Sequence, residues 1–530
     1  MKPDYVLPMP DRFLGALFRR VPGYCWWTFG SAMAVGLVSH LYMFTNKLPN
    51  HDDVGHTFTA TYGTQSGRWL LPTVLKLDGA FSTPLLIGIL GLLFLSVTAC
   101  LVACILRVRH RFSCTVLAAL LVAYPTVSAT YSYMFTADGY FLGLMLAALG
   151  AYWAIRFPRL GAALGAVSIT LSMGIYQSYF PVAAALMVGA MIFGTLDGRK
   201  SFRQLILHGV RLAAVLCAGM VLYMLMVKLT TRELGLVDYM GISTMGQIQL
   251  SQLPGLVARC YLWYIRFFFT DLVNSQFAIL RLPVLLCGAA AAVLLAVLLW
   301  KRRLGALRTA LVVVLVLLYP LAADLIYVMV AGQGVHLLMI YGSVLLLAAP
   351  IALVDYGSAD FVSLRLPQQS LCALMSWVIL ASMSLAGFTY VVGSNQAYLK
   401  MQLSMDQISS YSTRLLSAIE QCEGYEPGLP VVLLGSSSRT DDLNPTPALN
   451  ALTNGMTGIL DMSGMRTSYV YNYFLRYYMG FAGQVYLGTS QEAQTLAALE
   501  EVQAMPVYPG SGSVRVVDGY VVVKLYQAAE

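Results

Sequence analysis

Long apolar segments alternate with short polar ones along most of the chain. Windows of about 20 apolar residues recur, which is the length that a helix needs to cross a bilayer. The pattern predicts a polytopic α-helical membrane protein with about eleven transmembrane helices. They are expected at residues 24–44, 84–106, 113–131, 139–156, 160–176, 179–195, 206–229, 277–300, 307–331, 335–354 and 370–393.

The pattern changes after residue 393, where apolar runs shorten and Ser, Gly, Asp, Asn and Pro become frequent. VVLLGS at 431–436 is typical of a buried strand, and QEAQTLAALEEVQ at 491–503 of an amphipathic helix. VRVV, Asp518-Gly519 and YVVVKLY together predict a hairpin with a type I′ turn. We therefore expect two domains, a transmembrane domain over 1–393 and a small α/β domain over 394–530.

The composition agrees with a membrane protein. Of the 530 residues, 58% are hydrophobic and 11% charged, against roughly 45–50% and 25% in soluble domains. The first apolar run follows a tail that carries Lys2, Arg12, Arg19 and Arg20. Because this run is long and lacks a small-residue cleavage site, it is interpreted as a retained first helix.

Lysine and arginine in short loops predict the orientation, because they gather on the cytoplasmic side. The N-terminal tail, RVRHR at 107–111, DGRKSFR at 197–203 and KRR at 301–303 fall on one side of the predicted membrane. That side is expected to be cytoplasmic, which places the N-terminus inside and the C-terminal domain outside. This bias explains the net charge of +8 and leaves no basic patch for nucleic acid.

Three outer loops are then expected, over 46–83, 131–138 and 230–276. The last contains RCYLWYIRFFFTDLV at 259–273, which mixes aromatic residues with Arg266. Tyr and Trp favour the headgroup region, so either a helix in the outer interface or an ordinary aromatic belt fits this segment.

Several kinds of site have no support in the sequence. The nine cysteines are scattered, and only Cys422 lies in the C-terminal domain, so neither a disulfide framework there nor a zinc site is indicated. No phosphate-binding Walker loop occurs, which argues against ATP or nucleotide-sugar use on the cytoplasmic side.

The first outer loop contains the stretch NHDDVGHTFTATYGTQSGRW at 50–69. Acidic residues beside hydrocarbon need water, partners or a function. A hydrophilic loop whose carboxylates cap a following helix is one interpretation. Asp52 and Asp53 are adjacent, so on a helix their side chains diverge and take different roles.

Four motifs occur in a characteristic order. The acidic pair is followed by GRW with Arg68, then YSYMFTADGYFLGLML with Asp138, LSMGIYQSYF with Tyr176 and Gln177, and NQAYLK at 395–400. This order resembles the bacterial type II O-antigen glucosyltransferase family of the GT-C superfamily. The likeness covers most of the chain and is strongest over 45–195. One departure is His51, which separates Asn50 from the acidic pair.

The resemblance implies an enzyme of the bacterial cytoplasmic (inner) membrane with its active site on the outer face. Such enzymes transfer a hexose, typically glucose, from polyprenyl phosphate to a hydroxyl of a cell-surface glycan such as O-antigen or teichoic acid, with inversion. No cofactor is expected, and a divalent metal is not favoured. A flippase and a polyprenyl-phosphate glycosyl synthase are the implied partners.

The same resemblance suggests roles for individual residues. A carboxylate near the acceptor hydroxyl is the natural general base, and Asp53 is slightly preferred over Asp52. A guanidinium stabilises the departing phosphate, with Arg68 the first candidate. The further arginine candidates are Arg232 and Arg266, on the last outer loop.

Other candidates each have a structural alternative. Asp138 either binds sugar hydroxyls or orients an arginine, unless it is only a helix N-terminal charge. Tyr176 and Gln177 either contact the donor or serve as a belt tyrosine and a capping amide. His336, at the outer end of a predicted span, is a candidate for contact with phosphate.

Two other classes share the polytopic pattern. A transporter or lipid flippase predicts two similar halves and broken helices near the midplane, and no convincing repeat occurs. A glycan polymerase or ligase predicts a large arginine-rich outer loop and no C-terminal domain. For the C-terminal domain alone, a receptor or assembly role is a further alternative.

Overall fold

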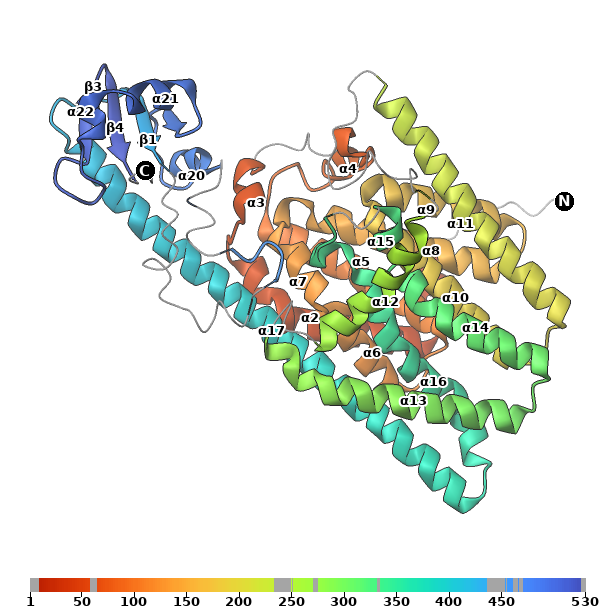
Figure 1. Cartoon of the computed structure of the whole chain (residues 1–530). Helices are drawn as coiled ribbons and strands as arrows, with labels where there is room; N and C mark the ends of the chain where they lie inside the picture. Colours follow the sequence, from red (N-terminus) through yellow and green to blue (C-terminus); the bar gives the residue numbers. More distant parts are fainter. Residues whose placement is uncertain are drawn as a thin grey trace.

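The computed structural model describes residues 9–57, 64–232, 249, 251–269, 275–330, 334–435, 453, 455–460, 466 and 470–525. Within these ranges the chain is a helical bundle joined to a small α/β domain (Figure 1). The fold predicted from the sequence, a polytopic helical protein with a small C-terminal sheet, is confirmed at that level.

The helices of the first half are α1 (Pro10–Phe18), α2 (Gly23–Thr45), α3 (His51–Gly55), α4 (Leu71–Val74), α5 (Pro84–Leu106), α6 (Arg111–Ala123), α7 (Pro125–Ser132), α8 (Ala137–Arg156), α9 (Leu160–Ile175), α10 (Phe180–Leu196) and α11 (Phe202–Thr230). The second half contains α12 (Leu253–Phe269), α13 (Arg281–Arg302), α14 (Ala306–Ala323), α15 (Ile326–Met329), α16 (Val344–Val362) and α17 (Leu366–Glu420). The C-terminal domain adds β1 (Val431–Leu434), α20 (Tyr471–Tyr477), β2 (Val485–Leu487), α21 (Gln491–Ala497), α22 (Glu500–Gln503), β3 (Val514–Val517) and β4 (Tyr520–Lys524).

Helical segments lie at all eleven predicted spans. Among the described residues, nine helical stretches are long and apolar enough to cross a membrane. The other two predicted spans correspond to α2, whose 23 residues include polar and small side chains, and to α9, which has only 16 residues. The chain is therefore a multi-pass membrane protein, while the number of crossings and their orientation stay predictions.

Three predicted spans differ from the structure in detail. The span at 113–131 is divided into α6 and α7 at Tyr124, because a residue before proline favours extended backbone. The span at 307–331 breaks after α14 at Asp324, whose buried carboxylate accepts a hydrogen bond from Ser343 Oγ. The span at 335–354 begins with two 3₁₀ turns, over 337–339 and 341–343, before α16.

The domain boundary expected at residue 394 falls inside a helix. α17 has 55 residues and runs from the bundle into the C-terminal domain as one long rod (Figure 1). By the helix rise it is about 80 Å long, more than twice the thickness of a bilayer core. NQAYLK at 395–400 belongs to its middle, where Tyr398 Oη lies 2.8 Å from His40 Nδ1 of α2.

The C-terminal domain is a four-stranded sheet in the order β2-β1-β4-β3. β1 pairs in parallel with β2 and β4, and β3 pairs antiparallel with β4. Alternate residues of β1 face opposite sides, as the strand period requires. Val431 and Leu433 pack against the end of α17 and α20, whereas Val432 and Leu434 pack against α21 and α22.

The predicted elements of this domain are largely present. β1 lies within the predicted strand, and Asp518 and Gly519 both have positive φ, as a type I′ hairpin turn requires. The helix predicted over 491–503 is wrong in one respect. It is interrupted at Leu499, whose extended backbone begins the separate helix α22.

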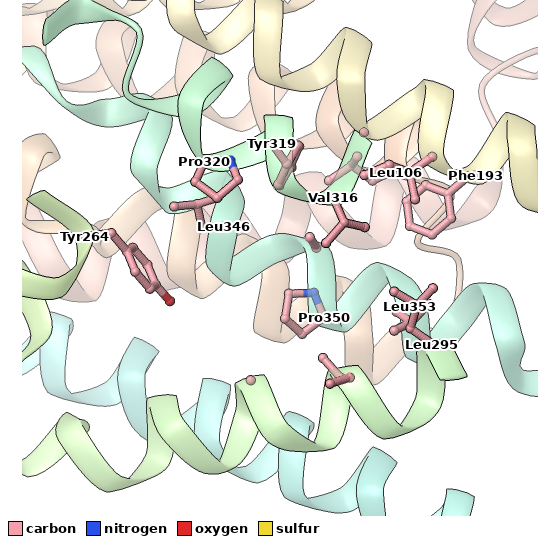
Figure 2. A pocket seen from close by; sticks show the side chains of 16 residues that line it. Leu106, Phe193, Tyr264, Leu295, Val316, Tyr319, Pro320, Leu346, Pro350 and Leu353 are labelled. Carbon is pink, nitrogen blue, oxygen red and sulfur yellow. The ribbon is translucent and has the colours of Figure 1, made fainter. Parts of the chain in front are cut away.

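An apolar crevice lies between α10, α13, α14 and α16 (Figure 2). Its volume is about 340 Å³, and its walls are aliphatic apart from a few aromatic side chains. Proline occurs inside two of the four helices, at Pro320 of α14 and Pro350 of α16. Proline removes a backbone hydrogen bond and bends a helix, which is consistent with incomplete closure of the four helices.

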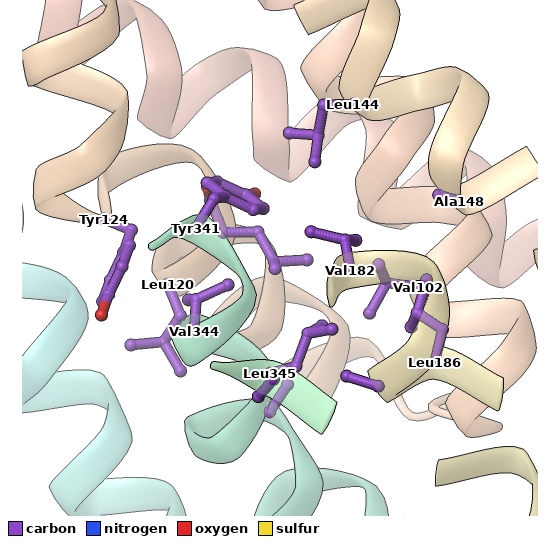
Figure 3. Close-up of a cluster of buried hydrophobic side chains, with 14 of the residues drawn as sticks. Val102, Leu120, Tyr124, Leu144, Ala148, Val182, Leu186, Tyr341, Val344 and Leu345 are labelled. Atoms are coloured by element: carbon purple, nitrogen blue, oxygen red, sulfur yellow. The ribbon is translucent and has the colours of Figure 1, made fainter. Parts of the chain in front are cut away.

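The centre of the bundle is closely packed aliphatic and aromatic side chains (Figure 3). They come from α5, α6, α8, α10 and the start of α16. The cluster drawn includes Val102, Leu120, Leu144, Ala148, Val182, Leu186, Tyr341, Val344 and Leu345, all of them buried. This packing holds the ends of α5, α8 and α10 in fixed positions, and the candidate site is built on those ends.

Three of the basic segments predicted to share one side, at 107–111, 197–203 and 301–303, lie close together. Arg107 donates two hydrogen bonds to Asp197, at 2.8 and 2.9 Å, and Tyr356 Oη donates to the same carboxylate at 2.8 Å. The Arg302 guanidinium lies over the Tyr356 ring and pairs with Asp360. These contacts join the ends of α5, α10, α13 and α16.

Replacing Asp197 by Ala is expected to destabilise the bundle by about 1 to 2 kcal/mol. The change leaves Arg107 and Tyr356 without their shared acceptor, and partial exposure of the pair reduces the cost. Thermal unfolding in detergent measures the effect, with exposed Glu501→Ala as the control for loss of one carboxylate. Equal unfolding temperatures for the two variants would show that the network is not stabilising.

Candidate active site

The acidic pair of the loop predicted over 46–83 lies in the short helix α3. Asn50 caps it, because its Oδ1 accepts the backbone N–H of Asp53 at 2.9 Å. Asp52 and Asp53 lie in the first turn, where carboxylates interact favourably with the helix dipole. The capping role proposed for the acidic pair thus belongs to Asn50, which leaves both carboxylates for other contacts.

Asp53 is buried, with 1% of its surface exposed. Its Oδ1 accepts hydrogen bonds from Ser82 Oγ at 2.6 Å and from the backbone N–H of Phe135 at 3.0 Å. Lys47 Nζ lies 3.3 Å from Oδ2. Asp53 therefore ties α3 to the start of α5 and to the second outer loop.

Asp52 points elsewhere, as expected for adjacent residues on a helix. Its side chain is 20% exposed, and its Oδ1 lies 3.4 Å from His51 Nε2. The imidazole of His56, one turn on, stacks on Phe135 with ring centroids 5.0 Å apart. Asp52 is thus the more accessible carboxylate of the pair.

The GRW and YQ motifs are in direct contact. Leu70 N–H donates to Gly174 O at 2.8 Å, and Gln177 Nε2 donates to Ser66 O at 2.9 Å. A side chain at Gly174 would collide with Trp69, since a Cβ there would lie 2.5 Å from the indole. The YQ segment therefore holds the loop that carries Arg68.

Arg68 is buried against two tyrosines. Its Nη1 donates to Tyr140 Oη at 2.8 Å, and its guanidinium lies 5.0 Å from the Tyr176 ring centroid. The rings of Tyr140 and Tyr176 are themselves stacked, 4.5 Å apart. Aromatic faces attract a guanidinium and fix its plane. Tyr176 and Gln177 thus have observed roles in placing Arg68, whereas their predicted contact with the donor stays a prediction.

Asp138 lies in the first turn of α8 and is buried. Its Oδ1 accepts the N–H of Gly139 at 2.7 Å, and the like charge of Asp78 acts on it. Burial raises the pKa of Asp78. Within the described ranges Asp138 makes no ion pair with an arginine. The predicted role of Asp138 in orienting an arginine therefore has no supporting contact in this part of the structure.

A second cavity, here called the basic pocket, lies beside α12 and has a volume of about 650 Å³. Arg259 and Arg266 line it together with Trp263, Tyr327 and Val335. α12 begins before the predicted helical segment, and the part of that segment from 270 to 273 lies outside the described residues. Sequence reasoning selected Arg266 but missed Arg259, which lies seven residues earlier on the same helix face.

His336 follows Val335, which lines the basic pocket, and lies near Arg68. Burial, and then the positive charge of Arg68, lower the pKa of His336 to about 4. Its Nδ1 is buried and has no hydrogen-bond partner among the described residues. His336 is thus an imidazole with an available ring nitrogen near Arg68, and it is the chain neighbour of a residue that lines the basic pocket.

The low pKa of His336 makes stability depend on pH. An unfolded histidine titrates near pH 6.5, so between pH 6.5 and 4 the unfolded chain binds the proton more tightly and stability falls as pH falls. On going from pH 7 to pH 5, the free energy of unfolding of His336→Gln is expected to fall by about 1 to 2 kcal/mol less than that of the wild type. Unfolding in detergent at both pH values measures this difference. Parallel losses in the two proteins would mean that His336 is protonated in the folded state.

The structure brings the acidic and GRW loops to one place, the 3₁₀ turn at 134–136 and the start of α8 that follows it. The backbone N–H of Phe135 donates to Asp53, and Tyr140 Oη accepts from Arg68. Phe135 and Tyr140 are close in the chain, within about 10 Å of each other along the helix axis. Arg232 is exposed at the end of α11 and makes no described contact with them. Among the residues that the structure covers, no group of three or more His, Cys, Asp or Glu is placed to hold a metal ion.

The C-terminal domain borders this site. Val54 of α3 is buried in the same hydrophobic cluster as Val470 and Phe474 of that domain. Gly458 lies against the second outer loop with φ +82°, and a side chain there would collide with Ser132 Oγ. Helix α3 is therefore packed between the bundle and the C-terminal domain.

The family model described as Glucosyl transferase GtrII matches residues 41–347, more than half of the chain. The chain belongs to this family. It is accordingly a membrane glycosyltransferase, and the resemblance drawn from the motif order is confirmed. Searches of the curated proteins and of the solved structures found no match.

The GtrII match contains every candidate site residue, from Asp52 to His336. It ends before the second half of α16, so α17 and the C-terminal domain lie outside it. The conserved activity of the family is therefore expected to reside in the bundle and its outer loops.

Proposed function

We propose that this GtrII-family enzyme transfers a hexose, most simply glucose, from polyprenyl phosphate to a hydroxyl group of a cell-surface glycan. The reaction takes place on the outer face of the bacterial cytoplasmic membrane, the side that carries α3 and the C-terminal domain. The basic ends of α5, α10 and α13 then face the cytoplasm, as the distribution of short-loop arginines favours.

Asp52 is the proposed general base. The acceptor hydroxyl oxygen attacks the anomeric carbon while its proton passes to the Asp52 carboxylate, and the bond from that carbon to the phosphate oxygen breaks. A single displacement of this kind inverts the anomeric configuration. Asp53 was slightly preferred from the sequence, but its burial and three donors suit an anchor better than a base.

The departing polyprenyl phosphate gains negative charge, which cationic and hydrogen-bonding side chains of the site would stabilise. Arg68 is the proposed main phosphate ligand, since tyrosines already fix its plane. His336 adds a neutral ring nitrogen, and Arg266 with Arg259 adds positive charge in the basic pocket. Asp138 is retained as a candidate for binding sugar hydroxyls.

One observation carries this proposal: the acidic loop and the GRW loop, both within the family match, are held at the start of α8. A base and a phosphate ligand held close together are what the transfer of a hexose from a phosphate to a hydroxyl requires. The donor must be made and brought to the outer leaflet, so a polyprenyl-phosphate glycosyl synthase and a flippase are the proposed partners. No metal is assigned a role.

Transfer by the purified protein in vesicles tests this proposal. Vesicles are loaded with polyprenyl phosphate carrying a radiolabelled hexose and mixed with bacterial surface glycan. Label is expected to move from lipid to glycan, and a nucleotide sugar in place of the lipid donor is expected to give none. Transfer from the nucleotide sugar alone would overturn the assigned donor.

A further inference from the structure

Helix α20 of the C-terminal domain carries two exposed tyrosines, Tyr473 and Tyr477, here called the tyrosine pair. They are four residues apart, which places them on one face of the helix. Their rings are nearly parallel, with centroids 5.9 Å apart and an angle of 12° between the planes. The guanidinium of Arg476, also exposed, lies 5.9 Å from the centroid of the Tyr477 ring. Two aromatic rings and a planar cation thus lie together on the surface of the domain.

The exposure of the tyrosine pair distinguishes it from the rest of the domain. Among the described residues from 421 to 525, the exposed large hydrophobic side chains are these two tyrosines, at 38% and 42%. The other aromatic and aliphatic residues of α20 are buried in the domain core, namely Tyr471, Phe474 and Leu475. The exposed side chains of α20 are therefore aromatic and cationic, whereas a helix that lies on a membrane also presents aliphatic residues.

The tyrosine pair borders the candidate active site. Helix α20 lies beside α3, the helix that carries Asp52 (Figure 1). The two helices share a hydrophobic cluster, in which Val54 of α3 is buried. Burial, and then the negative charge of Asp53, raise the pKa of Tyr478. Because Tyr478 follows Tyr477 in the chain, one end of the tyrosine pair is close to the acidic helix.

The chemistry of this surface suits a sugar ring. A pyranose has a face of C–H groups that packs against an aromatic ring, and its hydroxyl oxygens accept hydrogen bonds from a guanidinium. Tyrosine and arginine are also the side chains that most often dominate the binding energy of an interface, because each supplies a large, planar contact area.

We propose that the tyrosine pair and Arg476 bind a sugar unit of the acceptor glycan, away from the hydroxyl that reacts. This inference rests on the proposed function, because the acceptor is taken to be a cell-surface glycan. The bound glycan extends from α20 toward α3, where Asp52 is the proposed base. The family match ends at residue 347, so α20 lies outside it. The tyrosine pair therefore selects the acceptor, while the bundle and its loops carry out the transfer.

Four variants separate an aromatic contact from a general effect on the domain. Tyr473→Ala and Tyr477→Ala each remove one ring, whereas Tyr477→Phe keeps the ring and loses only the hydroxyl. Tyr520→Ala is the matched control, because Tyr520 also pairs with a tyrosine, Tyr486, at 6.2 Å between ring centroids. That second pair packs on the face of the sheet opposite to α20. Thermal unfolding in detergent checks that each variant is folded.

The variants are compared in nanodiscs by transfer of radiolabelled hexose to the delipidated surface polysaccharide of the source organism. Tyr473→Ala and Tyr477→Ala are each expected to raise KM for the polysaccharide about fivefold to tenfold, as loss of one aromatic contact predicts. Their kcat and their KM for the lipid donor are expected to stay unchanged, and Tyr477→Phe and Tyr520→Ala to match the wild type. An unchanged KM for the polysaccharide in both alanine variants, or an equal rise in KM for the donor, would overturn the acceptor site.

Binding of the same polysaccharide without donor separates this inference from the proposed reaction. Calorimetric titration of the full-length protein is expected to show binding by the wild type and Tyr477→Phe, and binding about fivefold to tenfold weaker by Tyr477→Ala. That pattern in a protein without transfer activity would support the acceptor site while refuting the reaction. Equal binding by Tyr477→Ala and the wild type, or no binding by the wild type, would refute the acceptor site, and hexose transfer by the same protein would leave the reaction standing.

Discussion

Replacing Asp52 by Asn is expected to lower kcat by about a hundredfold to ten-thousandfold while leaving the protein folded. An amide of the same shape cannot accept the acceptor proton, and general-base catalysis contributes about that much to rate. Because the Asp52 side chain is partly exposed, its replacement should cost little stability. Transfer of labelled hexose at saturating donor measures kcat, and thermal unfolding checks the fold.

Asp53→Asn is the matched comparison, since it makes the same chemical change one residue away. The amide would place N–H groups toward the Lys47 ammonium and would weaken the contacts with Ser82 and Phe135. A loss of about 1 to 3 kcal/mol in stability is expected. If Asp53→Asn instead stays fully stable and inactive while Asp52→Asn stays active, the base is Asp53.

Replacing Arg68 by Gln is expected to lower kcat/KM by about a hundredfold to a thousandfold. The change removes a fixed guanidinium from the departing phosphate, and removal of one such preorganised donor costs about that much. Arg68→Lys is expected to recover little, because an ammonium lacks the planar fork that lies on the rings of Tyr140 and Tyr176. Steady-state transfer with varied donor concentration measures both variants.

Arg232→Gln controls for the loss of one positive charge from the loop predicted over 230–276. Arg232 is exposed at the end of α11 and is expected to change kcat/KM by less than about threefold. A large loss in Arg232→Gln together with normal transfer by Arg68→Gln would place the phosphate at the later outer loop instead.

The positions of the helices could be predicted because hydrocarbon imposes a simple rule. A chain that crosses a bilayer must form helices of about 20 apolar residues, and such runs are visible in one sequence. The small strands were predictable for a similar reason, since Asp518-Gly519 demands a particular turn. The end of the last predicted span was less predictable, because polar residues can also continue a helix, and α17 extends from Leu366 to Glu420 without a break at residue 393.

The contacts within the site could not be predicted, because their partners are distant in sequence. Nothing near Asp53 indicates that Ser82 and Phe135 will bind it, and these two contacts distinguish it from Asp52. The order of the motifs indicated that GRW and YQ belong to one site. It did not indicate that Gln177 binds Ser66 and so holds the loop of Arg68.

The basic pocket shows the same limit. Arg266 was selected as one positive charge on an aromatic helix, whereas Arg259, Gly334 and Val335 also line the pocket. The spacing of seven residues between the two arginines on a helix is the signal that was available in the sequence.

The anomeric configuration of the transferred hexose tests the proposed single displacement most directly. Donor labelled with carbon-13 at the anomeric position is incubated with the enzyme and surface glycan, and the product is examined by NMR. Inversion relative to the donor is predicted, because Asp52 activates the acceptor for one attack on the face opposite the phosphate. Retention would contradict a single displacement with Asp52 as the base.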